Sequence, residues 1–444
     1  MEKLGSLTHL FVTVFLFNFA VIIVVPAITD ITMAALCPGK DECSLAIYLT
    51  GIQQAIIGLG TVVMMPLIGN LSDMYGRKAL LTLPMTVSII PLVILAYDRT
   101  TNFFYAYYGF RILTAMISEG SVQCLALAYV ADNISEGQRV SAFGVLSGIG
   151  SGAFVCGTLA ARFLSPARAF QVAAGVSMVA AVYMRLFLKE TTYEGDALAM
   201  PILKSVSDHD TAQSDGQSSR KVQVFKKIPS PVQLICLLKS SKILSQAALV
   251  AFFNSLADGG IQASLLYFLK ARFQFNKDQF ADTMLIVGTG ATISQLFFMP
   301  MLAPVIGENK LLSIGLFFGF SNMLLNSIAW AAWVPYVVCA LGVFSVFSIP
   351  CLRSIVSKQV GPNEQGMAQG CISGISSLAN IISPLIFSPL TALFLSQEAP
   401  FNFPGFSILC IGLASMIAFI QSLTIGVSHS GSSNIVGNNN CMVA

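Results

Sequence analysis

The chain has 444 residues, of which 55% are apolar and only 10% are charged, with a net charge of +3. Soluble domains carry about 25% charged residues, so this composition excludes a chain whose surface faces water throughout. The mean hydropathy of +0.76 instead places the chain in a lipid bilayer. Its basic residues are scattered over several connections, which excludes the basic stripe of a nucleic-acid-binding protein.

Twelve apolar segments are long enough to cross a bilayer, which takes about 20 residues each. They span 7–28, 45–68, 79–97, 103–129, 140–163, 169–188, 243–269, 280–303, 311–332, 334–355, 366–395 and 404–426. We therefore predict an all-α membrane protein whose twelve transmembrane helices form two six-helix bundles. The first segment is too long for the apolar part of a signal peptide, which has about 7–15 residues.

The polar stretches divide the chain into four predicted parts. An N-terminal bundle covers 1–190 and a C-terminal bundle covers 243–427. Between them, 191–242 is a polar linker that cannot bury a core of its own. The stretch 428–444 is rich in Ser, Gly and Asn, so we expect a disordered tail.

The distribution of Lys and Arg predicts the orientation of the spans. With twelve spans, both termini and the linker share one side, and that side carries sixteen of the 24 Lys and Arg, including Arg353 and Lys358. The other side carries seven, and Arg111 falls within a span. This excess favours a cytosolic position for both termini and the linker. The expected location is the plasma membrane or an endomembrane such as that of the vacuole or the Golgi apparatus.

The loop after the second span reads GNLSDMYGRK over 69–78. Gly69 and Gly76 allow a short turn that brings two helices close together. Asp73 can accept charge-assisted hydrogen bonds from a helix terminus, and Arg77 can pair with an acid. Such a cluster could hold one conformation and release another. Alternatively, Arg77 and Lys78 could simply anchor the loop on the cytosolic side.

The two halves carry related turns, which indicates an internal duplication. Met65-Pro66 ends the second span, Met299-Pro300 lies near the end of the eighth, and Gly76 and Gly307 then open the following turns. The second turn is shorter and lacks the Asp and Arg. Duplicated halves are typical of secondary transporters, whose substrate path runs between them.

Several segments together resemble the major facilitator superfamily. The loop 69–78 matches its signature between spans 2 and 3, and 108–115, with Arg111, is similar to a second family motif. The segments 128–132, 141–144 and 358–366, together with Gly370 and Pro384, resemble bacterial tetracycline–proton antiporters. The chain is most similar to the eukaryotic hippocampus-abundant-transcript-like branch, including its plant members. This resemblance implies the major facilitator fold and transport of a solute.

The fifth span departs from the antiporter pattern. Antiporters of this group carry a Gly-Pro pair followed by a Gly pair, whereas this chain lacks the proline and has alanines at the final two positions, 160 and 161. The small residues Gly148, Gly152 and Gly157 still permit close helix packing. The missing motif therefore weakens the case for antiport, and symport and facilitated diffusion remain open.

Three ionisable residues lie inside predicted spans: Arg111, Glu119 and Asp258. A charge at the bilayer centre costs at least about 2.5–3.5 kcal/mol, so such residues usually face a cavity. Arg111 and Glu119 are eight residues apart, which separates them by about 12 Å along a helix, so we do not expect a direct pair. Glu119 is the preferred proton carrier, and two glycines after Asp258 could interrupt span 7. Structural roles for all three remain the alternative.

Six amide side chains inside spans are candidates for lining the cavity of the proton and substrate pathway. Each could instead form only an interhelical hydrogen bond. They are Gln53, Gln54, Asn254, Gln262, Gln295 and Asn380.

Most of the ten cysteines lie in apolar spans, where a cysteine behaves as a small apolar residue. Cys37 and Cys43 flank a short polar loop and could form a disulfide if that loop faces an oxidising side. The sequence contains no metal-ligand cluster, no nucleotide-binding loop and no catalytic constellation, so we expect neither a cofactor nor an enzymatic activity.

The sequence therefore predicts a secondary active transporter that moves a small organic solute by alternating access, with protons as the coupling ion. The expected partners are the solute, protons and the lipid bilayer, and the expected state is a monomer. Two other functions stay open: a transporter-shaped adaptor or trafficking protein without flux, and a facilitator without ion coupling.

Overall fold

All regular secondary structure in the part of the chain that the structure describes is helical. The computed structural model describes residues 7–36, 44–190, 241–275, 277–396 and 399–429. Within these residues no β-strand occurs. The prediction of an all-α membrane protein is therefore confirmed.

Three predictions fall outside the described residues. They concern the linker, described only at 241–242, the tail, described only at 428–429, and the disulfide between Cys37 and Cys43.

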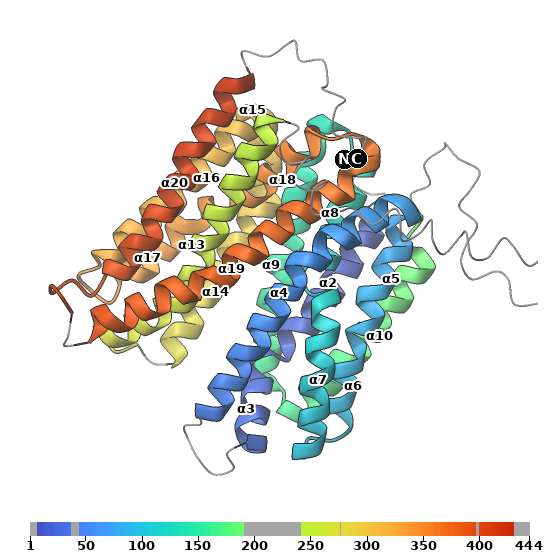
Figure 1. Ribbon diagram of the computed structural model, residues 1–444, viewed down its shortest axis with the longest axis horizontal. Helices are drawn as coiled ribbons and strands as arrows, with labels where there is room; N and C mark the ends of the chain where they lie inside the picture. The colour runs from blue at the N-terminus through green and yellow to red at the C-terminus, as the bar shows by residue number, and fades with distance from the viewer. Residues whose placement is uncertain (1–6, 37–43, 191–240, 276, 397–398, 430–444) are drawn as a thin grey trace, which may run out of the picture.

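The N-terminal half forms one bundle, coloured blue to green in Figure 1. In chain order its elements are α2 (Thr8–Ile23), α3 (Val25–Leu36), α4 (Ser44–Tyr75), α5 (Arg77–Val87), α6 (Ile89–Tyr97), α7 (Thr101–Ser118), α8 (Ser121–Asn133), the 3-10 turn η1 (Glu136–Gln138), α9 (Arg139–Phe163) and α10 (Pro166–Phe187).

The C-terminal half forms the second bundle, coloured yellow to red. Its elements are α13 (Lys242–Phe273), α14 (Lys277–Ile293), the π-helical turn η2 (Ser294–Phe298), α15 (Met299–Ile306), α16 (Glu308–Ser327), α17 (Val334–Leu341), the 3-10 segment η3 (Gly342–Phe347), α18 (Ser348–Lys358), η4 (Pro362–Glu364), α19 (Gln365–Leu395) and α20 (Phe406–His429).

Eleven helical segments in the described residues are long and apolar enough to cross a membrane. The predicted span that is missing from these eleven is the ninth, 311–332; it corresponds to α16, which forms a helix of 20 residues inside the C-terminal bundle. Polar residues at both of its ends, from Glu308 to Lys310 and at Asn322 and Asn326, lower its hydropathy. Since α16 packs along α20, neighbouring helices cover much of its surface.

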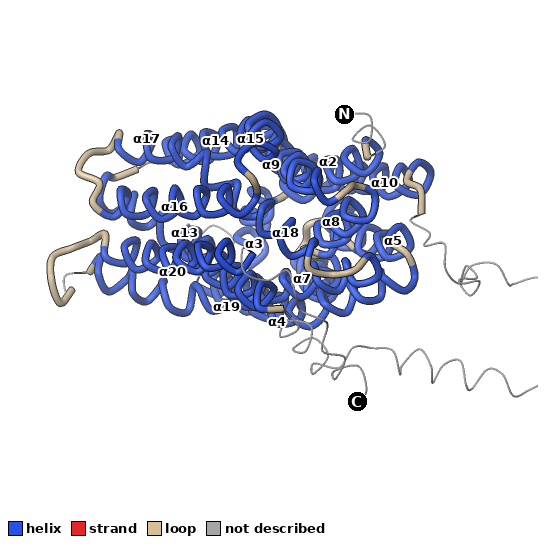
Figure 2. Tube along the Cα trace, turned by 90° about the horizontal axis from the view of Figure 1, so that it is seen from above, coloured by secondary structure: helices blue, strands red, loops and turns tan. Residues whose placement is uncertain are grey.

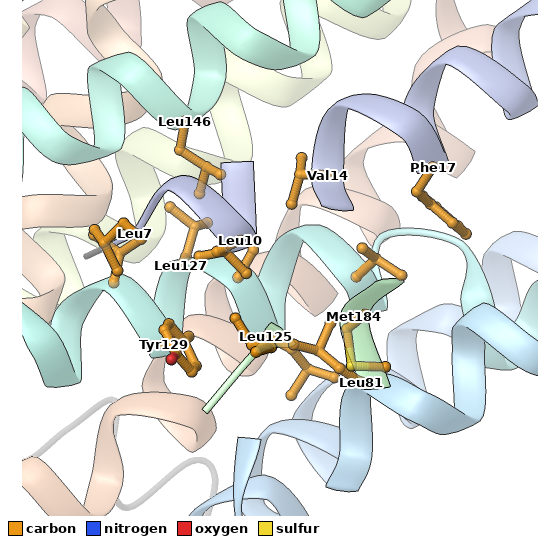
Figure 3. Packing of buried hydrophobic residues seen from close by; sticks show 14 of the residues in the cluster. Leu7, Leu10, Val14, Phe17, Leu81, Leu125, Leu127, Tyr129, Leu146 and Met184 are labelled. Atoms are coloured by element: carbon orange, nitrogen blue, oxygen red, sulfur yellow. The ribbon is translucent and has the colours of Figure 1, made fainter. Parts of the chain in front are cut away.

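Apolar side chains from distant parts of the chain fill each bundle. In the N-terminal half, Leu10 and Val14 of α2 meet Leu81 of α5, Leu125 of α8 and Met184 of α10 (Figure 3). A second cluster lies almost entirely in the C-terminal half, where it joins α13, α15, α16, α18, α19 and α20, and it also includes Val140 of α9. Each buried aliphatic side chain contributes about 1.5–3 kcal/mol where its burial removes it from water. Each half therefore has a core of its own.

Two helix breaks differ from the expected pattern. The fourth span is divided, because Glu119 is extended and Gly120 adopts φ +75°, a left-handed conformation that glycine accepts easily. In span 7 the expected interruption at 259–260 is wrong, since α13 runs unbroken from Lys242 to Phe273. The two glycines there leave room for neighbours: a Cβ on Gly259 would lie 2.9 Å from Ser383 Cβ.

The two bundles meet mainly where α19 packs against the N-terminal half and where α9 packs against the C-terminal half. Figures 1 and 2 show α4 beside α19, and α9 beside α14 and α15. The first pair approaches so closely that a Cβ on Gly370 would lie 2.6 Å from the carbonyl oxygen of Met65 and 3.0 Å from Pro66 Cα. Small residues therefore set the distance between the halves.

We expect Gly370→Ala to separate α4 from α19, because the added methyl group meets backbone atoms of 65–66 that cannot rotate away. The distance between spin labels at Tyr75 and Asn363, both exposed near this contact, should increase. The measurement is double electron–electron resonance on purified protein whose native cysteines have been replaced.

Gly175→Ala on α10 is the control, since no heavy atom lies within 4 Å of the added Cβ. Alanine is favoured over glycine in a helix by about 1 kcal/mol, so this variant should fold and keep the wild-type distance. An unchanged distance in Gly370→Ala would contradict the tight packing of α4 on α19.

Candidate functional site

The loop between α4 and α5 lies against the first turn of α19. Gly76 begins α5 with φ +93°, a conformation that strains any residue with a Cβ. One carboxylate oxygen of Asp73 accepts a hydrogen bond from the Gly366 N–H at 2.9 Å, and the other accepts from the Met367 N–H at 2.8 Å. The first N–H groups of a helix have no partner within it, so a residue of the N-terminal half satisfies the start of a C-terminal-half helix.

Arg77 holds this carboxylate in place. Its guanidinium contacts Asp73 at 2.5 Å and Asp132 at 2.8 Å, and it donates to the Ser72 hydroxyl at 2.5 Å. The Arg77 side chain is completely buried, so its charge depends on these two carboxylates. Asp132 ends the 128–132 segment noted in the sequence, but its pairing with Arg77 was not foreseen. We call Asp73, Arg77 and Asp132 the charge cluster.

Gly69 is required next to the charge cluster. A Cβ at this position would overlap the carbonyl group of Gly366, so only glycine lets α4 approach the start of α19. A Cβ on Gly366 would in turn meet Arg77, the Gly69 carbonyl oxygen and Ser72 Oγ. The two glycines face each other, and Gly69, Asp73 and Arg77 of the N-terminal half thus lie together against the start of α19.

Lys78 contributes to this region through its backbone. Its N–H donates to Glu190 Oε1 at 3.0 Å, which caps the start of α5. Among the described residues, no hydrogen bond or ion pair of its ammonium group occurs. The Lys78 side chain therefore lies apart from the charge cluster.

The related turn in the C-terminal half makes a different set of bonds. Gly307 has φ +84°, matching Gly76, but the following Glu308 pairs with Lys358 at 2.8 Å and accepts from Ser354 Oγ at 2.8 Å. These partners belong to the same half. A cavity of about 490 Å³ is lined by this turn, by Gly137 of η1 and by Val140 at the start of α9.

Arg111 and Glu119 form a direct ion pair, so the prediction that they cannot pair is wrong. Arg111 Nη2 lies 3.6 Å from Glu119 Oε2. The eight-residue spacing implied a separation of about 12 Å only for an unbroken helix. Because α7 ends at Ser118, Glu119 leaves the helical path and its carboxylate reaches back toward Arg111.

Asp258 lines a cavity of about 260 Å³ among α13, α18 and α19. Asn254 and Gln262, one turn before and after it on α13, also line the cavity, and Asn254 Nδ2 donates to Asp258 Oδ2 at 3.0 Å. Arg111 and Glu119 do not line it. The three predicted intramembrane charges thus lie in two places, one in each half.

Arg353 also lines this cavity. From the sequence, this residue was expected among the basic residues of the cytosolic connections. Its Nη1 donates to the carbonyl oxygen of Gln369 at 2.9 Å, and Gln369 Nε2 donates back to the Arg353 carbonyl oxygen at 3.1 Å. The sequence did hold one indication of this position, because Arg353 lies five residues before Lys358 and inside the predicted span 334–355. It points from α18 toward α19 and not into a loop.

Asn380 of α19 also lines this cavity, whereas the other predicted amides lie outside it. Gln295, in η2, accepts from Ser151 Oγ of α9 at 3.0 Å and donates to the Val346 carbonyl oxygen at 3.3 Å, so it joins the two halves. Gln53 is half-buried and Gln54 is exposed on α4. In the structure, Gln295 therefore forms hydrogen bonds between helices, which was the alternative to a place in the pathway.

The glycines of α9 pack in two directions. Gly148 faces Leu296 and Gly152 faces Thr292, so this stripe lies against the C-terminal half. Gly157 instead faces Ile22 of α2, where a Cβ would lie 3.0 Å from the Ile22 side chain. Small residues on α9 therefore serve both the junction between the halves and the N-terminal core.

Comparison with known proteins gives one family match. The sequence profile of the Major Facilitator Superfamily matches residues 10–384. The chain is 27% identical to the Hippocampus abundant transcript-like protein 1 of Bos taurus over 355 residues, which is 78% of this chain and 64% of that protein. The chain thus spans slightly less than two thirds of the length of this relative.

A bacterial relative and two solved structures are also similar. The Tetracycline resistance protein, class E, of Escherichia coli is 23% identical over 342 residues, covering 76% of this chain and 77% of that protein. The human organic anion transporter MFSD10 (TETRAN) has a TM-score of 0.75 at 18% identity and covers 95% of this chain and 100% of its own. A double-tryptophan mutant of XylE has a TM-score of 0.66 at 16% identity, with 96% of each chain covered. At these identities the two structures show a shared fold.

We expect Asp73→Asn to expose the first turn of α19. An asparagine carries one acceptor oxygen and one donor NH₂ group, so it cannot accept from both the Gly366 and the Met367 N–H, and it loses the charge that faces Arg77. Hydrogen bonds to charged groups contribute about 1.5–3 kcal/mol each. Amide hydrogen exchange of a peptide covering 365–368 should accelerate about tenfold or more.

Glu136→Gln is the matched control, because this exposed acid lies on the neighbouring turn η1 and no hydrogen bond of its side chain is present among the described residues. Its 365–368 peptide should exchange at the wild-type rate. Equal exchange in Asp73→Asn and wild type would show that the carboxylate does not protect α19.

Proposed function

The chain belongs to the Major Facilitator Superfamily, and from this premise we propose that it moves a small organic solute across a membrane by secondary active transport. The motif-based resemblance to this family is thereby confirmed. Two helical halves with a substrate path between them are the general design of such transporters. Transport, alternating access and proton coupling are our proposals for this chain.

The observation that carries this proposal is the bond between Asp73 and the start of α19. It joins the halves through hydrogen bonds to two backbone N–H groups, so a small displacement of α19 breaks both together. Apolar packing alone weakens gradually with displacement. A directional polar contact at one end of the interface suits a protein that alternates between two arrangements of its halves.

Glu119 and Asp258 are the proposed proton carriers. Each has a single described side-chain partner: Arg111 for Glu119 and Asn254 for Asp258. A carboxylate with few partners can gain or lose a proton without dismantling a network. We propose that protonation of one or both accompanies movement of the solute.

The names of similar proteins support the proposal that the transported solute is an organic molecule. One relative is named a tetracycline resistance protein and one structural neighbour an organic anion transporter. The cavity beside Asp258 presents amide, carboxylate and guanidinium groups, which suit a polar or charged organic molecule. We further propose that both termini face the cytosol, on the basis of the excess of Lys and Arg on that side.

Two other functions make different predictions. An adaptor or trafficking protein would need no contact that breaks during a cycle, whereas the charge cluster is arranged as such a contact. An uncoupled facilitator requires Glu119 and Asp258 to be structural. Membership of a transporter family supports a protein without enzymatic activity.

We expect purified protein in liposomes to move at least one labelled organic solute or drug, faster under an imposed pH gradient than without one. The double variant Glu119→Gln with Asp258→Asn should lose the acceleration by the gradient, because neither amide can carry a proton. The measurement is solute uptake with and without the gradient.

Asp282→Asn on α14 is the control, since this carboxylate is exposed and outside the proposed pathway, so its response to the gradient should equal that of wild type. Absence of flux for every solute under every gradient would refute transport. Unchanged acceleration in the double variant would refute coupling through these two carboxylates.

A further inference from the structure

The cavity beside Asp258 contains charges of both signs. It lies entirely within the C-terminal half and is lined by one face of α13, by α18 and by α19. Asp258 projects from α13 and Arg353 from α18. The described residues contain no ion pair between them, which places their charged atoms more than 4.0 Å apart.

Asp258 has one free oxygen at this cavity. Its Oδ2 accepts from Asn254 Nδ2 at 3.0 Å, and its Oδ1 accepts no hydrogen bond from any described residue. An ionised carboxylate can accept about four hydrogen bonds. Most of this capacity is thus left for a donor that enters the cavity.

Arg353 likewise has hydrogen-bond donors without a partner among the described residues. Its Nη1 is held by the carbonyl oxygen and Oε1 of Gln369, at 2.9 and 3.3 Å. Gln369 is fully buried, so it fixes the guanidinium in one orientation. Among the described residues, Arg353 Nε and Nη2 donate to no partner, and no carboxylate lies within 4.0 Å. This oriented edge can bind a planar anion through two parallel hydrogen bonds.

Two separated and incompletely paired charges inside a membrane protein are costly. Water can reduce this cost, but a ligand that carries both opposite charges can satisfy the two groups at once. The volume of about 260 Å³ is slightly smaller than that of typical pockets for drug-sized molecules, about 300–1,000 Å³. The cavity thus fits a small molecule.

The rest of the lining defines the body of this molecule. Ile349 and Leu352 of α18 and Ile372 of α19 place aliphatic groups beside the two charges. Aliphatic surface favours an apolar side chain between or beside the ligand's charged groups.

We propose that this cavity binds a small zwitterion with an apolar body, its anionic group held by Arg353 and its ammonium group held by Asp258. This assignment names a substrate class for the transport proposed above and rests on that function. Arg353 orients and neutralises the anion, while Asp258 selects for a positive charge. A ligand that lacks either charge leaves one of the two groups unpaired.

The test uses full-length purified protein and L-leucine, a zwitterion with an aliphatic side chain. L-Leucine methyl ester lacks the anion, and N-acetyl-L-leucine lacks the cation. Equilibrium binding of radiolabelled L-leucine, with the other two as competitors, gives three affinities. In wild type, L-leucine should bind at least about tenfold more tightly than either derivative.

Two variants separate the roles of the charges. Arg353→Gln should weaken L-leucine binding about tenfold or more but leave the methyl ester unaffected. Asp258→Asn should weaken L-leucine to a similar degree but leave N-acetyl-L-leucine unaffected. The unaffected ligand in each case also verifies that the variant is folded. Arg162→Gln, an exposed arginine at the end of α9, should match wild type for all three ligands.

Several results would overturn the assignment. Equal wild-type affinity for N-acetyl-L-leucine and L-leucine would indicate an anion site, and equal affinity for the methyl ester would indicate a cation site. Absence of L-leucine binding would also refute it. If L-leucine fails to bind while another solute crosses liposomes, only the substrate class is wrong. If L-leucine binds as expected but no solute moves, transport is wrong and the binding site stands.

Discussion

Two backbone N–H groups at the start of α19 donate to the carboxylate of Asp73, and this contact determines how the two halves meet. The cluster of Asp73, Arg77 and Asp132 has a formal charge of −1, and Arg77 is completely buried within it. The N-terminus of a helix supplies roughly half a positive charge, so α19 offsets part of the remaining negative charge. When α19 moves away, water must take its place. Closure is therefore favoured by electrostatics as well as by the glycine contacts.

The C-terminal half contains a turn at Gly307 that corresponds to the one at Gly76, but this turn makes no ion pair or hydrogen bond to the other half among the described residues. Gly307 repeats the positive φ of Gly76, which shows that the backbone of both turns needs glycine. Glu308 faces Lys358 of its own half, and a cavity lies where the turn would otherwise meet α9. The link to α9 at this end is instead a hydrogen bond from Arg139 Nη1 to the Ser357 carbonyl oxygen at 3.1 Å. The two junctions between the halves therefore differ in strength, and the one at Asp73 dominates.

The sequence predicted features that depend on local spacing and failed where the outcome depends on distant neighbours. Apolar run lengths and the pattern of 69–78 were sufficient for the helices and for the charge cluster's Asp73 and Arg77. Pairing of Arg111 with Glu119 was missed because it depends on a helix break that the following glycine permits but does not require. Conversely, the glycines at 259–260 do not break α13, because α19 and α20 pack against them. Arg353 was misplaced because its distance from a helix end does not determine which neighbour it faces.

One helix connects the charge cluster with the proposed binding cavity. The first turn of α19 binds Asp73, and Ile372 and Asn380 further along the same helix line the cavity. From Gly366 to Asn380 the helix rises about 21 Å, and no helix break separates them. A displacement that releases Asp73 therefore also moves one wall of the cavity. Arg353 of α18 is itself tied to this helix, because it exchanges hydrogen bonds with Gln369 of α19. The contact between the two halves and the proposed binding cavity therefore share one continuous helix, α19.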